Sequence, residues 1–205
     1  MMSSRRRFAL ACLLAAVPAR ALAVPEADAP AADPQAGQLL VAAPGMSDPR
    51  FARTVILMVK HDTRGALGLA INRPVGDKTV AELLRAFGED PGRAQGTLAV
   101  FAGGPLQPQA GFVVHSGEYR LPETVALDQQ VAVSPPRPVL RDIADGHGPR
   151  KRMLILGYAG WAPRQLEAEM SLGAWVTAVG SPELVFDMDR TKLWEAAFAR
   201  RILSL

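Results

Sequence analysis

One segment constrains the fold of this chain more than any other. Residues 54–60, TVILMVK, are β-branched and almost wholly apolar, which is typical of a central strand that is buried on both faces. A glycine at position 65 then precedes a second apolar run at residues 67–71, so the sequence predicts a hairpin here. Two apolar strands side by side need other strands beside them and helices or strands over them, because an isolated hairpin is marginal in water.

Other short segments have strand or helix character. The other predicted strands are residues 39–42, 97–102, 112–115, 125–133, 153–156 and 175–179. Four helices are predicted. The first begins with a capping box at Thr79–Glu82 and ends near Gly88. The others are residues 164–172, with Pro163 at the first helical position, residues 138–144, and residues 189–202, with Asp189 as the cap. Because strands outnumber helices and do not alternate with them regularly, the sequence predicts an α+β fold rather than a doubly wound sheet.

The first 23 residues have the pattern of a bacterial export signal. Residues 5–7 are three arginines, an apolar stretch follows to residue 17, and residues 21–23 read Ala-Leu-Ala, an A-x-A cleavage site. Residues 4–8, Ser-Arg-Arg-Arg-Phe, also match the twin-arginine export pattern. An arginine-rich Sec signal is the alternative. We therefore expect a cleavable leader at residues 1–23 and a periplasmic protein.

A short tether and one domain follow the leader. Residues 24–37 are rich in alanine and proline and have no aromatic residue, so we expect a flexible tether there and a single domain at residues 38–205. Without the leader, 19 basic residues face 20 acidic ones, which does not favour strong nucleic-acid binding. Cys12 is the only cysteine and would leave with the leader, so no disulfide is expected.

The sequence contains no strong catalytic or metal-binding motif. His61, His115 and His147 lack the short spacings of zinc ligands, so neither a metal nor a cofactor is predicted. There is no G-x-S-x-G or S-x-x-K motif. Glu167 and Glu169, two positions apart on a predicted helix, point to different faces and make a poor acid/base pair. No catalytic residue is therefore assigned.

A glycine-rich segment offers a possible anion site. Residues 157–161, GYAGW, follow a predicted strand and precede a predicted helix, where free N–H groups could bind an anion. The segment lacks a full G-x-G-x-x-G and a P-loop Gly-Lys pair. We interpret it as a tight strand-to-helix turn with Tyr158 and Trp161 packed beneath it.

Several motifs in a consistent order resemble one bacterial family. They are LVAAPGM at residues 40–46, DPRF at 48–51, HD to GALGL at 61–69, NRP at 72–74, FAGGP at 101–105, GFVVH at 111–115, GYAGW with QLE and Glu169 at 157–169, Trp175, and PELVFD at 182–187. From Gly37 to about Ile202 this set resembles the AlgH/YqgE family (DUF179, UPF0301). The resemblance implies an α+β domain with a mostly antiparallel or mixed β-sheet wrapped into a partial barrel and flanked by helices. It implies no known reaction.

The resemblance also singles out polar positions. The family's shared polar residues correspond here to His61, Asp62, Asn72, Arg73, His115, Gln165 and Glu167. Arg73 could fork onto a carboxylate or phosphate, and Gly103 and Gly104 would allow a ligand to approach the backbone closely. We favour the alternative that Arg73 pairs internally with Glu167 or Asp62. With Tyr158 and Trp161, these residues form the candidate ligand-binding set.

These observations lead to one expectation and two alternatives. We expect an exported, non-enzymatic AlgH-like domain, monomeric and without a transmembrane helix in the mature chain, that binds a partner protein or a small ligand. The first alternative is a small-molecule hydrolase with a cleft around His61, Arg73, His115 and Glu167, which requires at least three such side chains to converge. The second is a cytoplasmic transcriptional regulator, as some family members are described, although the sequence has no helix-turn-helix pattern.

Overall fold

The computed structural model describes residues 34–202. In this part of the chain the strands are β1 (Leu39–Ala42), β2 (Val55–Asp62), β3 (Gly65–Ala70), β4 (Pro74–Thr79), β5 (Thr97–Ala102), β6 (Leu106–Ser116), β7 (Val125–Ala126), β8 (Val131–Ser134), β9 (Arg152–Trp161) and β10 (Trp175–Ala178). The helices are α1 (Val80–Ala86), α2 (Pro136–Ala144), α3 (Gln165–Ser171) and α4 (Leu193–Ala199), and a π-helical turn, η1, covers Glu183–Asp187. The predicted leader and residues 24–33 of the predicted tether lie outside the described residues.

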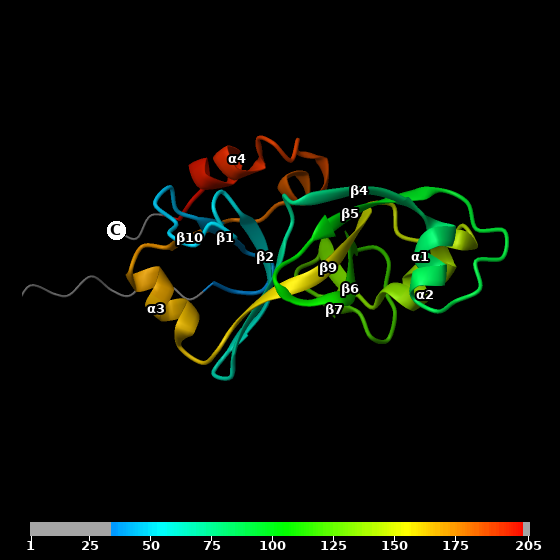
Figure 1. Cartoon of the computed structure of the whole chain (residues 1–205), viewed down its shortest axis with the longest axis horizontal. Helices are drawn as coiled ribbons and strands as arrows, with labels where there is room; N and C mark the ends of the chain where they lie inside the picture. The colour runs from blue at the N-terminus through cyan, green and yellow to red at the C-terminus, as the bar shows by residue number, and fades with distance from the viewer. Residues whose placement is uncertain (1–33, 203–205) are drawn as a thin grey trace, which may run out of the picture.

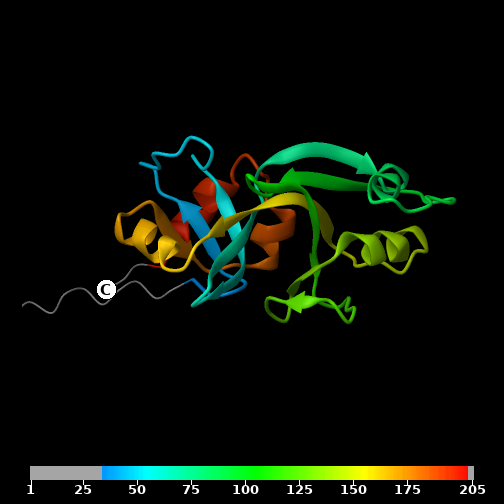
Figure 2. The same ribbon diagram turned by 60° about the horizontal axis from the view of Figure 1, so that its bottom comes forward.

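One long strand, β9, holds the sheet together. The sheet order is β10-β1-β2-β3-β9-β6-β8-β7, and β5 joins β9 in parallel while pairing with β4 on its other side. The first half of β9 pairs with β5 and β6, whereas its last three residues, 159–161, pair with β3. In Figures 1 and 2 β9 accordingly runs from a lobe with α1 and α2 to a lobe with α3 and α4. The sheet is curled and mostly antiparallel, and with its flanking helices it confirms the predicted α+β half-barrel.

The first two strands are buried on both faces. Leu39 and Val41 of β1, with Val55 and Leu57 of β2, belong to the core beneath α4. The alternate residues of the same two strands face the opposite side of the sheet and pack with Leu166 of α3 in a second core. Since side chains alternate across a strand, a strand covered on both sides has to be apolar at every position. This confirms the prediction of a doubly buried strand, and the β2–β3 pairing confirms the hairpin.

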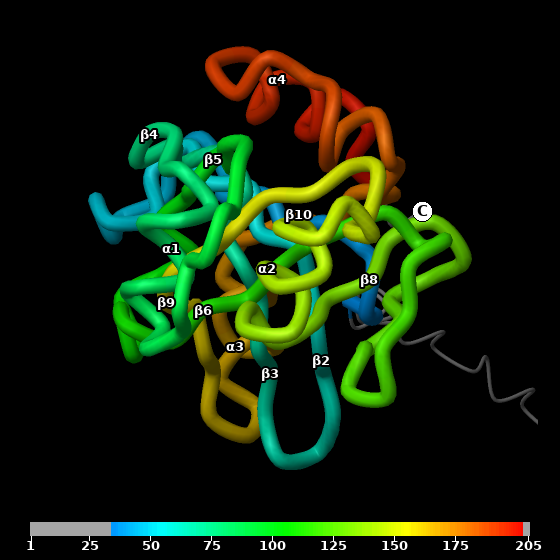
Figure 3. The backbone as a smooth tube through the Cα atoms, turned by 90° about the vertical axis from the view of Figure 1, so that its right-hand side faces the viewer, coloured from blue at the N-terminus to red at the C-terminus, as the bar shows by residue number. Residues whose placement is uncertain are grey.

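The helices cover the sheet at three places. A third core lies between β5, β6 and the pair α1 and α2, which face the viewer in Figure 3. Helix α4 lies over β1 and β2, where the Trp194 indole Nε1 donates to the carbonyl of Ala42 at 2.8 Å. Helix α1 has the predicted capping box, in which Glu82 N–H donates to Thr79 Oγ1 at 3.1 Å and Thr79 N–H donates to the Glu82 carboxylate at 2.8 Å.

Several predicted elements differ from the structure. Residues 125–133 form two short paired strands rather than one, because the segment 127–130 turns around Asp128, whose carboxylate accepts from the N–H groups of Gln130 and Val131. Strand β4 was not predicted, since all six of its residues are exposed and they lack the usual alternation. Asp189 does not cap α4, which begins at Leu193; its carboxylate instead bonds Thr191.

The segment GYAGW is not a turn. Strand β9 continues through Trp161, so the predicted strand-to-helix turn is wrong, and the segment does not lead directly into a helix N-terminus. Gly157, at φ +72°, permits a local irregularity after which β9 changes its partners. Pro163 lies two residues before α3 rather than at its first position, because Arg164 takes a left-handed conformation at the helix start.

The described end of the predicted tether contacts the domain. Within residues 34–37, Gly37 N–H donates to the carbonyl of Met58 at 2.9 Å, and the Pro34 carbonyl lies 3.1 Å from His61 Nδ1. These contacts place residues 34–37 beside the second half of β2. Among the described residues, no helix combines the length and the hydropathy that crossing a membrane requires.

Candidate functional site

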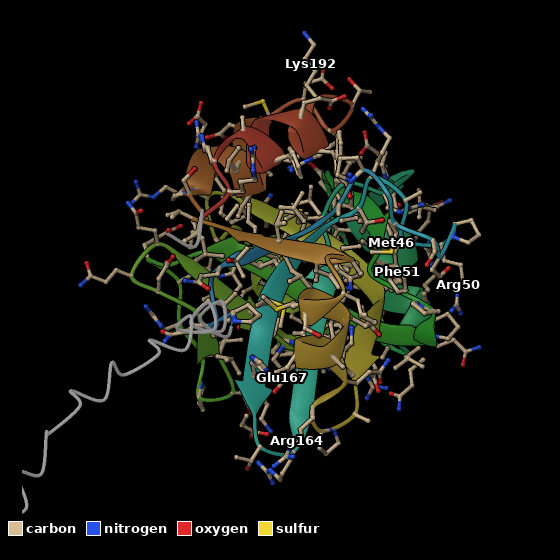
Figure 4. All side chains as sticks on the ribbon, turned by 90° about the vertical axis from the view of Figure 1, so that its left-hand side faces the viewer. Met46, Arg50, Phe51, Arg164, Glu167 and Lys192 are labelled. Atoms are coloured by element: carbon tan, nitrogen blue, oxygen red, sulfur yellow. The ribbon has the colours of Figure 1, made fainter. Side chains whose placement is uncertain are left out.

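A cavity of about 480 Å³ opens at one side of the lobe that contains α3. The loop after β1, the end of β9, helix α3 and the start of β10 all contribute to it. We call it the aromatic pocket and define it by Met46, Phe51, Trp161, Glu169 and Trp175. Figure 4 shows Met46 and Phe51 together near one edge of the molecule, next to Arg50, which also lines the pocket.

Glu169 organises the floor of the aromatic pocket. Its Oε2 atom accepts hydrogen bonds from the indole Nε1 of Trp161 at 3.0 Å and of Trp175 at 2.8 Å. Its Oε1 atom accepts from the Gln165 amide at 2.9 Å, one helical turn away. Three donors from β9, α3 and β10 therefore meet one carboxylate and fix the two indoles relative to the helix.

The aromatic rings pack edge to face. The Phe51 and Trp175 ring centroids are 5.5 Å apart at an angle of 67°, and those of Trp161 and Trp175 are 5.9 Å apart at 83°. Both tryptophans are buried, whereas Phe51 is half-buried and belongs to the loop. Such T-shaped contacts stabilise an aromatic cluster beyond simple area burial. The pocket therefore has a rigid apolar floor and one more exposed aromatic wall.

The charged groups of the aromatic pocket are already bonded within the protein. Asp48 accepts from Arg50 side-chain nitrogens, with Nη2 at 2.7 Å from Oδ2, and this contact lowers the pKa of Asp48. Ser47 supplies a hydroxyl, but among the described lining residues there is no histidine, lysine or cysteine that could act as a base or nucleophile. The arrangement is suited to holding an apolar group rather than to acid/base chemistry.

A second, smaller cavity of about 300 Å³ adjoins the aromatic pocket. The two cavities share Arg50, Phe51 and Pro105. The remaining lining residues of the smaller cavity are Thr54, Ala70, Arg73, Ala102 and Gly104, and we call it the Arg73 pocket. The structure thus brings two of the predicted ligand-binding residues, Arg73 and Gly104, to one cavity.

Arg73 is held by uncharged acceptors. Its Nη2 atom donates to the Ala52 carbonyl at 3.0 Å and to Thr54 Oγ1 at 2.6 Å. The prediction that Arg73 pairs with Glu167 or Asp62 is wrong, because both carboxylates bond other residues. The preceding residue, Asn72, fastens the same loop: its Oδ1 accepts from Val55 N–H at 3.0 Å, and its Nδ2 donates to the Arg53 carbonyl at 2.8 Å.

Gly103 and Gly104 permit a close approach, but the group that approaches is β9. A Cβ atom on Gly103 would lie 2.3 Å from the Gly157 carbonyl oxygen, and one on Gly104 would lie 2.2 Å from the Tyr158 carbonyl carbon. Gly103 also exchanges backbone hydrogen bonds with Leu156 and Ala70. The glycine pair therefore lets its own backbone lie against the backbone of β9. Having no side chain, Gly104 lines the Arg73 pocket with backbone atoms.

His61 and Asp62 lie at the end of the β2–β3 hairpin. His61 Nε2 is 3.3 Å from Glu167 Oε1, while Asp62 bonds Lys60 at 2.9 Å and Arg64 at 3.3 Å. Hydrogen bonding from Lys60, and then from Arg64, lowers the pKa of Asp62 to about 2. His61, Asp62 and Glu167 line a separate cavity of about 680 Å³, beside Pro34. In Figure 4 Glu167 accordingly lies away from Met46 and Phe51.

His115 is enclosed in the core of the other lobe. Its Nε2 lies 2.9 Å from Ser134 Oγ, its Nδ1 lies 3.0 Å from the Ser116 carbonyl oxygen, and the Tyr119 ring packs against it edge to face. The side chain is fully buried. Burial lowers the pKa of His115, because the protonated form loses its hydration. The histidine is therefore a bonded core residue.

The predicted hydrolase cleft is not formed. Arg73 lies in one cavity, His61 and Glu167 line another, and His115 is buried in the core. Tyr158 is half-buried and packs against Phe112, with ring centroids 6.2 Å apart. Residues 34–202 contain no cluster of three or more metal-ligating side chains.

Other pocket residues were missing from the sequence-based set. Trp161 and Gln165 were predicted, but Glu169 was considered only as half of a poor acid/base pair, and Phe51 and Trp175 were given no site role. The spacing of Gln165 and Glu169, one helical turn apart, placed them on the same face and could have indicated their contact. Phe51 and Trp175 are too far apart in sequence for any spacing to join them.

Comparisons with known proteins agree on one family. The family model described as AlgH-like, DUF179, matches residues 39–203. A UPF0301 protein of Jannaschia sp. is 42% identical over 163 residues, which cover 78% of this chain and 85% of the relative. A UPF0301 protein of Pseudomonas syringae pv. tomato is 42% identical over 168 residues, covering 80% and 87%.

Two solved structures have a similar fold. The solution structure of the AlgH protein from Pseudomonas aeruginosa has a TM-score of 0.68 and 41% sequence identity, and the match covers 80% of this chain and 87% of that one. The crystal structure of a protein from Corynebacterium diphtheriae has a TM-score of 0.65 at 25% identity, covering 84% and 90%.

Proposed function

This chain belongs to the AlgH-like family DUF179, which includes the UPF0301 proteins, and from that premise we propose that it is an exported, non-enzymatic domain that binds a small ligand. The aromatic pocket is the binding site in this proposal, and it takes the apolar part of the ligand. The family membership supports the fold, while the ligand-binding role is argued from the pocket.

One observation carries the proposal: an open cavity has a fixed aromatic floor. Its volume of about 480 Å³ falls within the range of roughly 300–1,000 Å³ that is typical of small-molecule sites. The bonds from Trp161, Trp175 and Gln165 to Glu169 hold that floor in place before a ligand arrives. A preformed site loses little conformational entropy on binding, which favours affinity.

Part of the rim of the pocket is also apolar. Leu172, 85% exposed, and Leu106, 43% exposed, both line the aromatic pocket. Exposed large aliphatic side chains beside a concave aromatic surface are typical of a binding site rather than of an ordinary surface. They extend the apolar contact available to a ligand beyond the floor.

We propose a non-enzymatic role because the carboxylates of the pocket already accept hydrogen bonds from other residues of the protein. The Glu169 carboxylate already accepts three hydrogen bonds, and that of Asp48 is bonded to Arg50. Hydrogen bonding from Arg50 lowers the pKa of Asp48, which makes that carboxylate a weak general base. Export is supported by the sequence of residues 1–23.

A fluorescent probe tests the aromatic pocket. N-phenyl-1-naphthylamine is neutral, aromatic and emits strongly only in an apolar site, so we expect its emission to rise on titration with the protein. Phe51→Ala removes the aromatic wall and should weaken probe binding about tenfold, since burying a phenyl group contributes on the order of 2 kcal/mol.

Phe198→Ala is the matched control. Phe198 is also half-buried, but it stacks on Trp194 in α4 and does not line the aromatic pocket. It should leave probe affinity within about twofold of the unmodified protein. Equal loss of affinity in both variants, or no binding of the probe at all, would contradict the proposed site.

A further inference from the structure

We propose that the Arg73 pocket binds the acidic head group of the same ligand, which makes the ligand an amphiphilic organic anion. This inference rests on the proposed function, because it adds a head-group site to the aromatic pocket. It is argued from two features: the Arg73 guanidinium is charged, held in place and accessible, and the two cavities share lining residues.

Arg73 differs from the two other arginines of this region. Arg50 bonds the carboxylate of Asp48, and Arg53 bonds that of Glu195 while stacking over Trp194. Among residues 34–202, no carboxylate lies within ion-pair distance of Arg73. The Arg73 pocket therefore has a cationic group whose charge the described part of the fold leaves uncompensated.

The Arg73 guanidinium is fixed and still accessible. Its Nη2 atom bonds Ala52 and Thr54, which sets the plane of the group. Its Nε and Nη1 atoms bond no described residue. Since every fully buried side-chain nitrogen or oxygen in this part of the chain has a partner, these two atoms are open to solvent. Because Nη2 is occupied and the Nε and Nη1 donors point to opposite sides of the group, an oxyanion would bind one of these two atoms through a single charge-assisted hydrogen bond.

The lining of the Arg73 pocket favours an anion with an apolar body. Apart from Arg50, Arg73 and Thr54, its side chains are apolar, and no acidic residue of the described chain lines it. A low-polarity wall strengthens the attraction between a guanidinium and an anion, because fewer water molecules screen the charges. A small inorganic anion would leave these apolar walls unused.

Charge also sets the direction of the ligand. Asp48 and Glu169 both line the aromatic pocket, which disfavours a negative head group there. The cavities adjoin at Arg50, Phe51 and Pro105. A ligand with its oxyanion at Arg73 can thus pass Phe51 and place its apolar body against Trp175.

Two probes that differ in a single group test the proposal. 8-Anilinonaphthalene-1-sulfonate has the aromatic skeleton of N-phenyl-1-naphthylamine with one sulfonate added. We expect Arg73→Gln to weaken binding of the sulfonate probe tenfold or more, because a charge-assisted bond is lost. The same variant should leave the neutral probe within about twofold, which also shows that the aromatic pocket is intact.

Arg137→Gln is the matched control for charge. Arg137 is exposed on α2, lines neither pocket, and its substitution changes the net charge by the same amount. It should leave both probes unaffected. Arg73→Lys, which keeps the charge but loses the fixed planar group, should bind the sulfonate probe with intermediate affinity.

A competition experiment requires no variant. Octanoate should displace the neutral probe from the unmodified protein at concentrations at least tenfold lower than octanol, which has the same chain length without the charge. If the neutral probe binds and octanoate and octanol compete equally, the head-group proposal is overturned while the aromatic pocket stands. If neither probe binds, the proposed function itself fails.

Discussion

At the scale of single residues, His115 shows how a buried histidine couples the fold to pH. Both ring nitrogens have partners, at Ser134 Oγ and the Ser116 carbonyl, and the ring is fully buried. In turn, Ser134 Oγ lies 2.7 Å from Thr124 Oγ1, so the contact extends to the loop before β7. Because burial disfavours the imidazolium, the pKa of His115 in the folded protein is below its usual value.

The consequence is a loss of stability in mild acid. As pH falls through about 6.5, His115 takes up a proton in the unfolded chain while the folded protein still resists it. The free energy of unfolding, measured by urea denaturation, should therefore be highest above pH 6.5 and decrease toward pH 5. His115→Gln should lower stability at pH 7.5 but flatten this pH dependence.

His147→Gln is the control for that series. His147 is exposed in the loop after α2, so its substitution should preserve the decrease in acid. A His115→Gln variant whose unfolding free energy keeps the slope of the unmodified protein would show that other groups cause the pH dependence.

The same scale shows how much of the site can be predicted from sequence. Residue types that commonly bind ligands, such as Arg73 and Trp161, can be selected because their chemistry is local. Their partners cannot, because Arg73 bonds a threonine 19 residues away and Phe51 packs on Trp175 across most of the domain. The predicted convergence of His61, Arg73 and His115 failed for this reason: chain order does not fix which cavity a side chain enters.

At the scale of secondary-structure elements, α1 depends on Thr79, the residue that caps its N-terminus. The helix has only seven residues and its N-terminal N–H groups need acceptors, which the reciprocal Thr79–Glu82 bonds provide. Thr79→Ala should lower the free energy of unfolding by about 1 kcal/mol, measured by urea denaturation.

Thr63→Ala provides the comparison for the cap. Thr63 is exposed in the β2–β3 turn and its hydroxyl bonds no described residue, so this variant should change stability by less than about 0.5 kcal/mol. Equal losses in the two variants would show that the capping box contributes nothing specific to α1.

Elements were predictable where one local pattern dominated. Strand β2 is apolar at successive positions because both of its faces are covered, and α1 has a capping box, so both were identified. Strand β9 was cut short because Gly157 and Gly160 resemble turn residues. Gly157 is needed instead where β9 changes its partner strands, and Gly160 is needed where the Leu106 and Tyr158 side chains lie close to the backbone of β9. Tertiary contacts, rather than local propensity, decide such positions.

At the scale of the whole molecule, the predicted leader at residues 1–23 indicates a periplasmic location. We expect a mature-sized protein in the periplasm when the full chain is expressed with a C-terminal tag in its own host. Replacing Arg5, Arg6 and Arg7 with lysine keeps the charge of the leader but removes the arginine pair, so cell fractionation should show the mature form lost from the periplasm.

Arg20→Lys lies outside the arginine pair and should leave export unchanged. Mature periplasmic protein that persists in the triple variant would indicate a Sec signal. Full-length protein retained in the cytoplasm by every version would overturn export and make intracellular ligands the next search.

The contact between the two ends of the described chain also bears on synthesis. Strand β1 lies between β2 and β10, and Trp194 of α4 bonds the Ala42 carbonyl across 152 residues of sequence. A ribosome must therefore synthesise β10 and α4 before the first strand can meet its last partners. A nascent chain stopped short of β10 and α4 would leave the apolar faces of β1 and β2 uncovered, which invites aggregation and proteolysis. Completion of the domain thus waits for α4, and any machinery that inspects the protein for a finished fold must wait for that helix as well.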